Sequence, residues 1–299
     1  MTLDNPSTFD FDEPSTFDLG EANVVEAGTA PGAKRSAKAG VAGSVLPPLA
    51  VGLFIVGVWY FISLVVLDPK RQFLLQPPHE VWNVGFADWK NFSTMLEGMW
   101  SSTKVAFWGL LIAILLGFLL AIVMSQAKVV ERAIFPYAVV LQAIPILAIV
   151  PLIGFWFGYG FSSRVLVCVI IALFPIVVNT LFGLLSADQG MHDLFTLHKA
   201  HRITRLRRLM FPAALPAVFA GLRISAGLSV IGAIVGDFFF GQGEVGIGQL
   251  LKRYANRLEG EQLFASVILS SALGVSVFLF FGWLSGKLIG KWAGESRGR

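Results

Sequence analysis

The side chains best placed to act on a solute are polar groups inside long apolar runs. Asp237 and Arg223 are the acid and the cation that interrupt such runs, and Gln142 and Asn179 lie in two runs that also contain prolines. Burial in hydrocarbon is costly for such groups, so they line a water-filled path or join neighbouring helices. Both interpretations stay open for Gln142, Asn179 and Asp237. Arg223 is the weaker path candidate, because a long side chain can extend its charge to the membrane surface.

A second set of candidates forms a basic segment between two apolar runs, over residues 188–215. Apolar residues recur there at helical spacing, so one helix face would be apolar and the other cationic. We expect a helix near 193–210 that ends at Pro212, because proline cannot continue the hydrogen-bond ladder. Such a helix contacts lipid headgroups or docks a soluble partner. The residues assigned to this contact are Asp193, Leu197, Lys199, Ile203, Arg205, Leu206, Arg208 and Pro212.

Motifs for nucleotide and metal chemistry carry little weight here. Gly241-Gln-Gly-Glu-Val-Gly246 matches the dinucleotide fingerprint as a string, but it follows an apolar run instead of the first strand of a βαβ unit. The sequence contains no phosphate-binding loop in which Lys precedes Ser or Thr. His198 and His201 lack a third ligand, so no metal site is expected. We therefore expect no catalytic residue and no enzyme activity in this chain.

Composition indicates a polytopic membrane protein. Hydrophobic residues make up 55% of the 299 residues and charged residues 14%, outside the usual range of soluble domains. Nucleic-acid binding is not expected, because the cations are spread over the ends of the apolar runs. Six runs are long enough to cross about 30 Å of hydrocarbon as helices, which predicts an all-α bundle. They lie near 44–67, 102–124, 133–157, 163–185, 213–240 and 262–289.

The prolines of the third and fourth runs predict kinked, central spans. The loop at 68–101 is expected to contain a short helix after Pro77-Pro78. Lys and Arg counts favour one orientation: with a cytoplasmic N-terminus, fourteen cations face the cytoplasm and eight the outside. Both termini and the basic segment are then cytoplasmic.

The chain is expected to divide into three parts. Residues 1–43 have the composition of a disordered cytoplasmic tail, with seven acids and no Lys or Arg in the first 33 residues. Residues 44–290 form the transmembrane domain. Residues 291–299 form a second cytoplasmic tail.

The basic segment resembles the cytoplasmic signature of the membrane subunits of binding-protein-dependent ABC importers. That signature reads Glu-Ala-Ala, three residues, Gly, nine residues, Ile-x-Leu-Pro. The resemblance puts Asp193 at the Glu, Lys199 at the Gly and Pro212 at the closing Pro. The spacing is kept, whereas the two Ala positions hold Leu194 and Phe195.

The surrounding residues resemble one branch of that family, which imports nitrate, sulfonates, taurine, bicarbonate and pyrimidine vitamin precursors. The segment 211–223 is similar to the family's entry into the next span. The segments that resemble the branch are Ile144-Pro145 through Pro151, Trp156-Phe-Gly-Tyr-Gly160, Phe174-Pro-Ile176, Asn179-Thr180, Ile231-Gly-Ala-Ile-Val-Gly-Asp237-Phe238 and Gly246-Ile-Gly248. Relatives often carry Glu at the Asp237 position. The resemblance covers about residues 44–290.

The resemblance implies the fold of a type I ABC importer permease in a bacterial inner (plasma) membrane. Two copies would form the path, two ATPase subunits holding ATP and Mg would dock on the cytoplasmic loops, and a substrate-binding protein would deliver a small nutrient. The chain itself would hold no cofactor, and membrane lipid would be a further partner. A sulfonate, an oxyanion and a thiamine-type pyrimidine stay open as substrates, as does a heterodimer. The alternatives are a self-sufficient secondary transporter, which would require inverted repeats, and a membrane scaffold protein.

Overall fold

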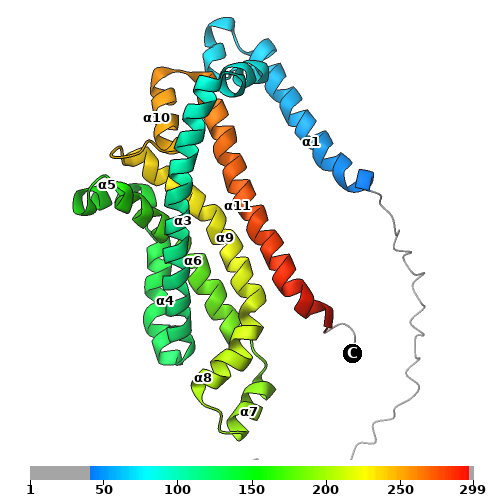
Figure 1. Cartoon of the computed structure of the whole chain (residues 1–299), viewed down its shortest axis with the longest axis vertical. Coiled ribbons are helices and arrows are strands. Elements are labelled where there is room, and N and C mark those ends of the chain that lie inside the picture. Colours follow the sequence, from blue (N-terminus) through cyan, green and yellow to red (C-terminus); the bar gives the residue numbers. More distant parts are fainter. Residues whose placement is uncertain (1–40, 296–299) are drawn as a thin grey trace, which may run out of the picture. The chain divides into compact units, whose positions relative to one another are not determined.

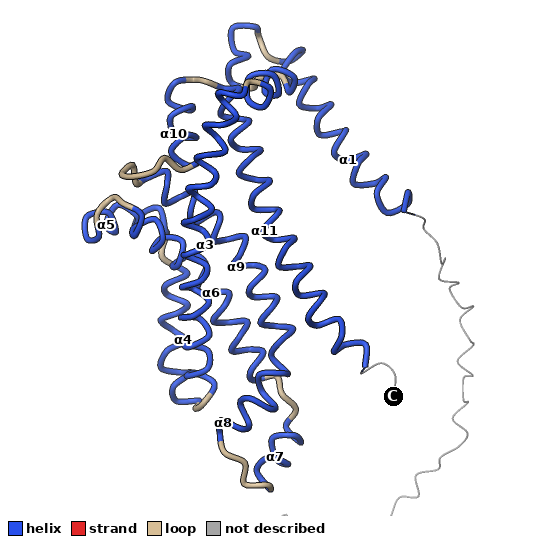
Figure 2. The backbone as a smooth tube through the Cα atoms, viewed as in Figure 1, coloured by secondary structure: helices blue, strands red, loops and turns tan. Residues whose placement is uncertain are grey.

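The structure, a computed structural model, describes residues 41–295 (Figure 1). Most of the predicted N-terminal tail and the last four residues lie outside the described residues. The chain divides into two compact units between Leu53 and Phe54. The described part of the first unit is the start of α1, and the second unit holds the elements discussed below. Every regular element within residues 41–295 is a helix (Figure 2), so the all-α prediction is confirmed.

The helices follow one another through short connections. The long helices are α1 (Val41–Phe61), α3 (Trp89–Ser125), α4 (Lys128–Ala143), α5 (Ile146–Phe157), α6 (Phe161–Leu185), α9 (Phe211–Phe239), α10 (Ile247–Arg257) and α11 (Gly260–Glu295). The short helices are α2 (Pro78–Glu80), α7 (Gln189–Leu197) and α8 (Arg202–Arg205). Short 3-10 or π-helical segments fill Ile62–Val66, Pro69–Leu74, Val81–Ala87 and Leu206–Met210. The short helix predicted after Pro77 is present as α2.

Five helical stretches within the described residues are long and apolar enough to cross a membrane, and the number is six if the bent pair of α4 and α5 is counted as one span. The five are Leu46–Val66, Trp89–Ser125, Phe161–Leu185, Arg202–Phe239 and Gly260–Leu288. The second begins well before the predicted residue 102. Its start is fixed by Asp88, whose side chain accepts a 3.0 Å hydrogen bond from the Lys90 backbone N–H and caps the helix.

The bend predicted in the span over 133–157 is present, and it is sharper than a kink. The chain breaks between α4 and α5, and the two helices meet at 98°. The break follows from Pro145, which disfavours helical geometry in the residue before it; Ile144 is extended, with ψ 125°. The two halves of this run differ in position within one copy: α4 has no buried residue among the described residues, whereas α5 packs Val150 and Ile153 into a core cluster with Phe240.

The helix predicted near 193–210 is not one helix, and it does not end at Pro212. A turn over His198–His201 separates α7 from α8. From Arg202 the helix then runs without a break to Phe239. Pro212 is accommodated within this continuous helix directly after a π-helical turn, Leu206–Met210, where the regular α-helical hydrogen-bond pattern is already interrupted.

The core lies where α6 packs between α3 and α9, and small residues permit close contact. A Cβ atom added to Gly232 would lie 2.8 Å from the Cα atom of Cys168, and one on Gly236 would lie 3.0 Å from the Cα atom of Arg164. In a membrane the hydrophobic effect does not drive helices together, because the lipid around them is as apolar as their side chains. Helices associate there through close packing of this kind. Ser225 of α9 adds a 2.7 Å hydrogen bond to the Ala172 carbonyl of α6. The fourth run is therefore central, as predicted.

Candidate functional site

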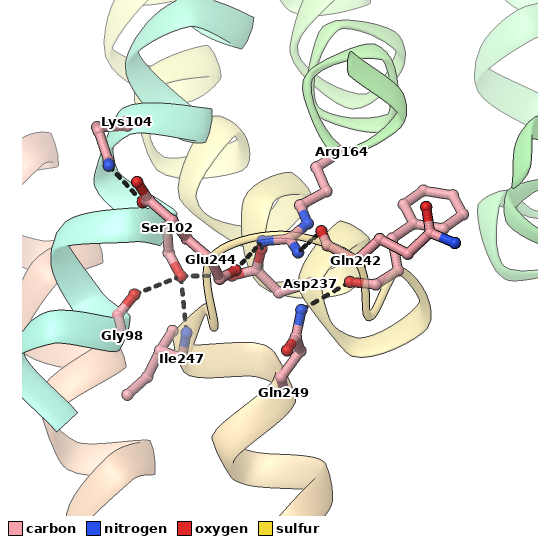
Figure 3. A network of polar contacts seen from close by, with 10 residues as sticks. Gly98, Ser102, Lys104, Arg164, Asp237, Gln242, Glu244, Ile247 and Gln249 are labelled. Carbon is pink, nitrogen blue, oxygen red and sulfur yellow. Dashed lines mark hydrogen bonds and ion pairs between the residues drawn. The ribbon is translucent and has the colours of Figure 1, made fainter. Parts of the chain in front are cut away.

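A buried polar network joins α3, α6, α9 and the start of α10 (Figure 3). It lies where α9 ends and α10 begins, and this part of the bundle is called the α10 end. The network centres on Asp237, two residues before the end of α9. Asp237 is 0% exposed and Arg164, its partner on α6, is 2% exposed.

Arg164 connects the carboxylate to the loop that follows α9. Its Nη1 atom lies 3.2 Å from Asp237 Oδ1 and donates a 2.8 Å hydrogen bond to the Glu244 carbonyl. Its Nη2 atom donates a 2.7 Å hydrogen bond to the Gln242 carbonyl. The Arg164 guanidinium group thus binds a helix and a loop at the same time, because its N–H donors point in fixed, diverging directions. Losing either charge would leave the other buried without compensation.

Ser102 of α3 supplies the third side of the network. Its hydroxyl contacts Asp237 Oδ2 and lies 3.0 Å from the Gly98 carbonyl, and it accepts a 2.9 Å hydrogen bond from the Ile247 backbone N–H. A single serine therefore contacts α3, α9 and the first residue of α10. Gly246 packs directly on the carboxylate, because an added Cβ would overlap the carboxylate of Asp237.

The loop over residues 240–246 is fastened at several further points. The Gln242 N–H donates to the Tyr159 carbonyl at 3.2 Å, and Gln249 Nε2 donates to the Phe240 carbonyl at 2.7 Å. Lys104 and Glu244 form an ion pair at the surface. The hydrogen bond and the charge of Lys104 hold the pKa of Glu244 below its usual value. The string that resembled a dinucleotide fingerprint is thus a fastened turn.

The three candidates for the translocation path lie apart in the chain. Asp237 belongs to the network just described. Asn179 lies on α6, where its Nδ2 atom donates 2.8 Å to the Pro175 carbonyl and its Cβ packs close to Gly221 of α9. Gln142 is exposed on α4, two residues before the break. The structure does not bring these three side chains together in one copy, and their path role stays a prediction.

Arg164 and Ser102 were missed by sequence reasoning. Arg164 is one of the eight cations that the sequence assigns to the outer face, and it lies inside α6, three residues from the start. Asp237 lies two residues from the end of the antiparallel α9. An acid and a cation at the same depth in two apolar runs indicate an ion pair. Comparing the depths of charged residues between runs would have identified the pair of Arg164 and Asp237.

The other end of α9 carries the second predicted site, called the α7–α8 end. α7 closes with a Schellman turn: Lys199 N–H donates 2.9 Å to the Thr196 carbonyl, and Ala200 N–H donates 3.0 Å to the Phe195 carbonyl. Lys199 has φ 49°, the left-handed region that favours glycine. The Gly of the importer signature falls on this residue, so the turn explains why that signature has glycine there.

The predicted contact residues divide into exposed and packed groups. Leu197 is 80% exposed and Ile203 is 69% exposed. Leu206, in contrast, packs against the core of α3, α6 and α9. Arg205 braces the two short helices, because its Nη2 atom donates 2.8 Å to Thr196 Oγ1 of α7. Asp193, Lys199 and Arg208 are exposed, and Pro212 is half-buried at the start of α9.

Comparison with known proteins decides what this bundle belongs to. Residues 113–290 match the family of binding-protein-dependent transport system inner membrane components. The chain belongs to this family. It is a multi-pass permease subunit of an ABC importer, a transporter component and not an enzyme.

Individual relatives agree with the family. The permease is 39% identical over 170 residues to the formylaminopyrimidine transport permease protein ThiX of Halalkalibacterium halodurans, covering 57% of this chain and 67% of that protein. It is 31% identical over 216 residues to a probable ABC transporter permease protein of Haemophilus influenzae, covering 71% and 87%. It is 26% identical over 190 residues to the putative aliphatic sulfonates transport permease protein SsuC of Bacillus subtilis, covering 64% and 68%.

A solved structure shows that the fold is shared. The crystal structure of an amino acid ABC transporter with histidines has a TM-score of 0.51 and 19% sequence identity, and it covers 66% of this chain and 93% of that one. The predicted importer-permease fold is therefore confirmed.

Proposed function

We propose that two copies of this permease form the translocation path and that separate ATPase subunits, which hold ATP and Mg, drive it from the α7–α8 end. The observation that supports docking is the exposure of Leu197 and Ile203 on short helices that follow a span. Apolar side chains on a polar loop mark a surface for a protein partner, and a short amphipathic helix can fill a groove on that partner. Arg208 and Asp193 are also exposed at this end, and we propose that they contribute to the rim of the contact.

We infer that the α7–α8 end and both termini are cytoplasmic. The Lys and Arg bias supports this orientation. The α10 end then faces the side from which a substrate-binding protein delivers the nutrient. The membrane is the bacterial inner membrane in this proposal.

The network of Asp237, Arg164 and Ser102 is proposed as a latch that keeps the α10 end closed. The connectivity of the network supports this role, because the network joins α3, α6 and α9 to the loop over 240–246 in one buried cluster. Opening that end would separate at least one of these partners. Gln142 and Asn179 are retained as proposed path residues that a second copy would bring into place.

We propose a thiamine-type pyrimidine as the substrate class, ahead of sulfonates and oxyanions. The relative named for formylaminopyrimidine transport shows the higher identity. The described spans also lack a cluster of free cations that would bind an oxyanion, because the charge of Arg164 is neutralised by Asp237. An uncharged heterocycle needs no such cluster.

Reconstitution tests the function directly. The permease is co-expressed with the ATPase subunit and substrate-binding protein of the same importer and placed in vesicles. Uptake of a labelled formylaminopyrimidine should require ATP and stop with an ATPase subunit that cannot hydrolyse it. Uptake driven by an ion gradient without the ATPase would instead establish a secondary transporter. Uptake of an alkanesulfonate or nitrate, but not of the pyrimidine, would reject the substrate proposal alone.

A further inference from the structure

Arg223 is a cation within an apolar span that the latch and the α7–α8 surface do not use. Its guanidinium carbon lies 3.9 Å from the centre of the Phe278 ring of α11. A Cβ atom added to Gly282 would lie 3.2 Å from the same carbon. The Nε atom is shielded from solvent and has no hydrogen-bond partner among residues 41–295. Contact with an aromatic face thus offsets only part of the cost of placing this charge here.

The depth of the guanidinium follows from its helix. Arg223 precedes Asp237 by 14 residues, which is about 21 Å along the α9 axis toward the α7–α8 end. Side chains on a helix lean toward its N-terminus, and that end of α9 is the α7–α8 end. Gly282 is followed by Trp283, whose ring lies 5.1 Å from Lys287 Nζ. Trp beside Lys marks a membrane–water boundary, so the guanidinium lies near the headgroup level of the leaflet at the α7–α8 end.

An apolar groove runs from this point between α9 and α11. It encloses about 590 Å³, and Ser270 and Ser271 are the only hydroxyl side chains among its described lining residues. Its floor and walls include Ile224, Gly227, Leu228, Ile231, Gly274 and Phe278. A Cβ atom on Gly227 would meet nothing within 4 Å, so the groove is open there. Such a lining suits a hydrocarbon chain better than a polar nutrient.

No ion pair joins Arg223 to a carboxylate among residues 41–295. Asp237, the one acid inside an apolar run, is already paired with Arg164. Glu131, at the α7–α8 end, faces a separate polar cavity that it shares with Arg202 and Arg205.

We propose that the α9–α11 groove binds an anionic phospholipid, with the phosphate at Arg223 and an acyl chain along the groove. The guanidinium fork matches two phosphate oxygens, and basic pockets between spans bind acidic headgroups. The lipid would wedge α11 against α9. The proposal rests on the multi-pass permease fold and is independent of the substrate and of the ATPase contact proposed above.

The test is native mass spectrometry of the purified, delipidated permease to which phosphatidylglycerol or phosphatidylcholine is added. The wild-type protein should retain phosphatidylglycerol preferentially. Arg223→Gln should lower that retention about tenfold, because a charge-assisted hydrogen bond contributes at least that factor. Gly274→Leu keeps the charge but fills the groove, and it should lower the retention of both lipids. The matched control is Lys252→Gln, which removes a cation stacked on Phe238 at the α10 end and should leave retention unchanged.

Three results would overturn the proposal. The first is wild-type retention of phosphatidylglycerol by Arg223→Gln. The second is displacement of the lipid by an alkanesulfonate or nitrate, which would place Arg223 on the translocation path. The third is a Gly274→Leu protein that keeps its lipid but loses its dimer, which would show that the second copy fills the groove. If Arg223→Gln does not insert, the Gly274→Leu and competition experiments still decide the matter.

Discussion

The carboxylate of Asp237 and the guanidinium of Arg164 lie 3.2 Å apart, and both side chains are withdrawn from solvent. The two residues are 73 positions apart in sequence and lie on adjacent helices at the α10 end. A buried ion pair adds little net stability compared with a well-packed apolar pair, whereas removing one partner costs about 3–5 kcal/mol. Single and double variants of this pair should therefore differ in stability, and comparing their stability with their uptake separates a structural role from a role in gating.

The first prediction uses a double-mutant cycle on this pair. Arg164→Met alone and Asp237→Leu alone should each lower the thermal stability of the detergent-solubilised permease strongly, because each leaves one buried charge. The double variant should recover most of that stability. If the pair is a latch, uptake by the double variant stays impaired. Full recovery of coupled uptake would show that the pair only packs α6 against α9.

The second prediction concerns the ATPase contact. Leu197→Asp with Ile203→Asp should weaken retention of the ATPase subunit, because a central apolar anchor commonly contributes about 2 kcal/mol or more. Leu206 is a poor test site, since it packs against the core. The measurement is pull-down from solubilised membranes with permease levels followed in parallel. Leu258→Asp, an exposed leucine at the α10 end, is the control; equal retention by both variants would reject the docking surface.

The third prediction concerns the left-handed residue at the end of α7. Lys199→Gly should raise the melting temperature slightly, because a side chain in this backbone region costs about 1 kcal/mol. Lys199→Ala removes the same charge but keeps a Cβ atom, so it should show no such gain. Equal melting temperatures for the Gly and Ala variants would mean that the Schellman turn does not limit stability.

The fourth prediction is a pH dependence at the surface pair of Lys104 and Glu244. The pKa of Glu244 is lowered in the folded protein from its ordinary value of 4.5, so the pair contributes above that value and is lost as the pH falls through the lowered pKa. Glu244→Gln should therefore cause a small loss of thermal stability at neutral pH that disappears in acid. The check is a series of melting curves for both proteins, and a difference that grows in acid would contradict the pairing.

The fifth prediction concerns orientation. In a Cys168→Ala background, Gln189→Cys should react with an impermeant thiol reagent only from the cytoplasmic side, and Gln242→Cys only from outside. Both side chains are exposed, and Cys168 is fully buried, so its removal is a precaution. The reverse labelling pattern would invert the proposed topology.

The spans and the family could be predicted from sequence because both depend on local patterns. Apolar length alone locates a helix in lipid, and a motif with fixed spacing identifies relatives. The break at Ile144 was also encoded locally, in Pro145, but a hydropathy run does not distinguish a kink in a span from two helices at 98°. The same limit applies to Pro212, where a π-helical turn absorbs a proline that was expected to end the helix.

The candidate site was harder to predict because its partners are distant in sequence. Asp237 was singled out by its burial cost, yet Arg164 and Ser102 come from other helices, and nothing in their own neighbourhoods names the partner. Arg164 and Asp237 can be paired only when their depths in the bundle are compared, and those depths follow from where α6 begins and where α9 ends. The exposed residues Leu197 and Ile203 were found from periodicity, whereas the burial of Leu206 depends on the bundle behind it.

The π-helical turn over Leu206–Met210 has a geometric consequence for the permease. It lies within a helical segment of 38 residues, Arg202–Phe239, about 57 Å long. This segment joins the proposed ATPase contact surface to the residues beside the proposed latch. A π-turn holds one residue more than the α-helix around it, and one residue corresponds to about 100° of helical rotation. The direction in which α8 points around the α9 axis therefore depends on this one extra residue. If the π-turn converted to regular α-helix, Ile203 would rotate to another side of the helix, while its distance from Asp237 along the axis would change by only about the rise of one residue.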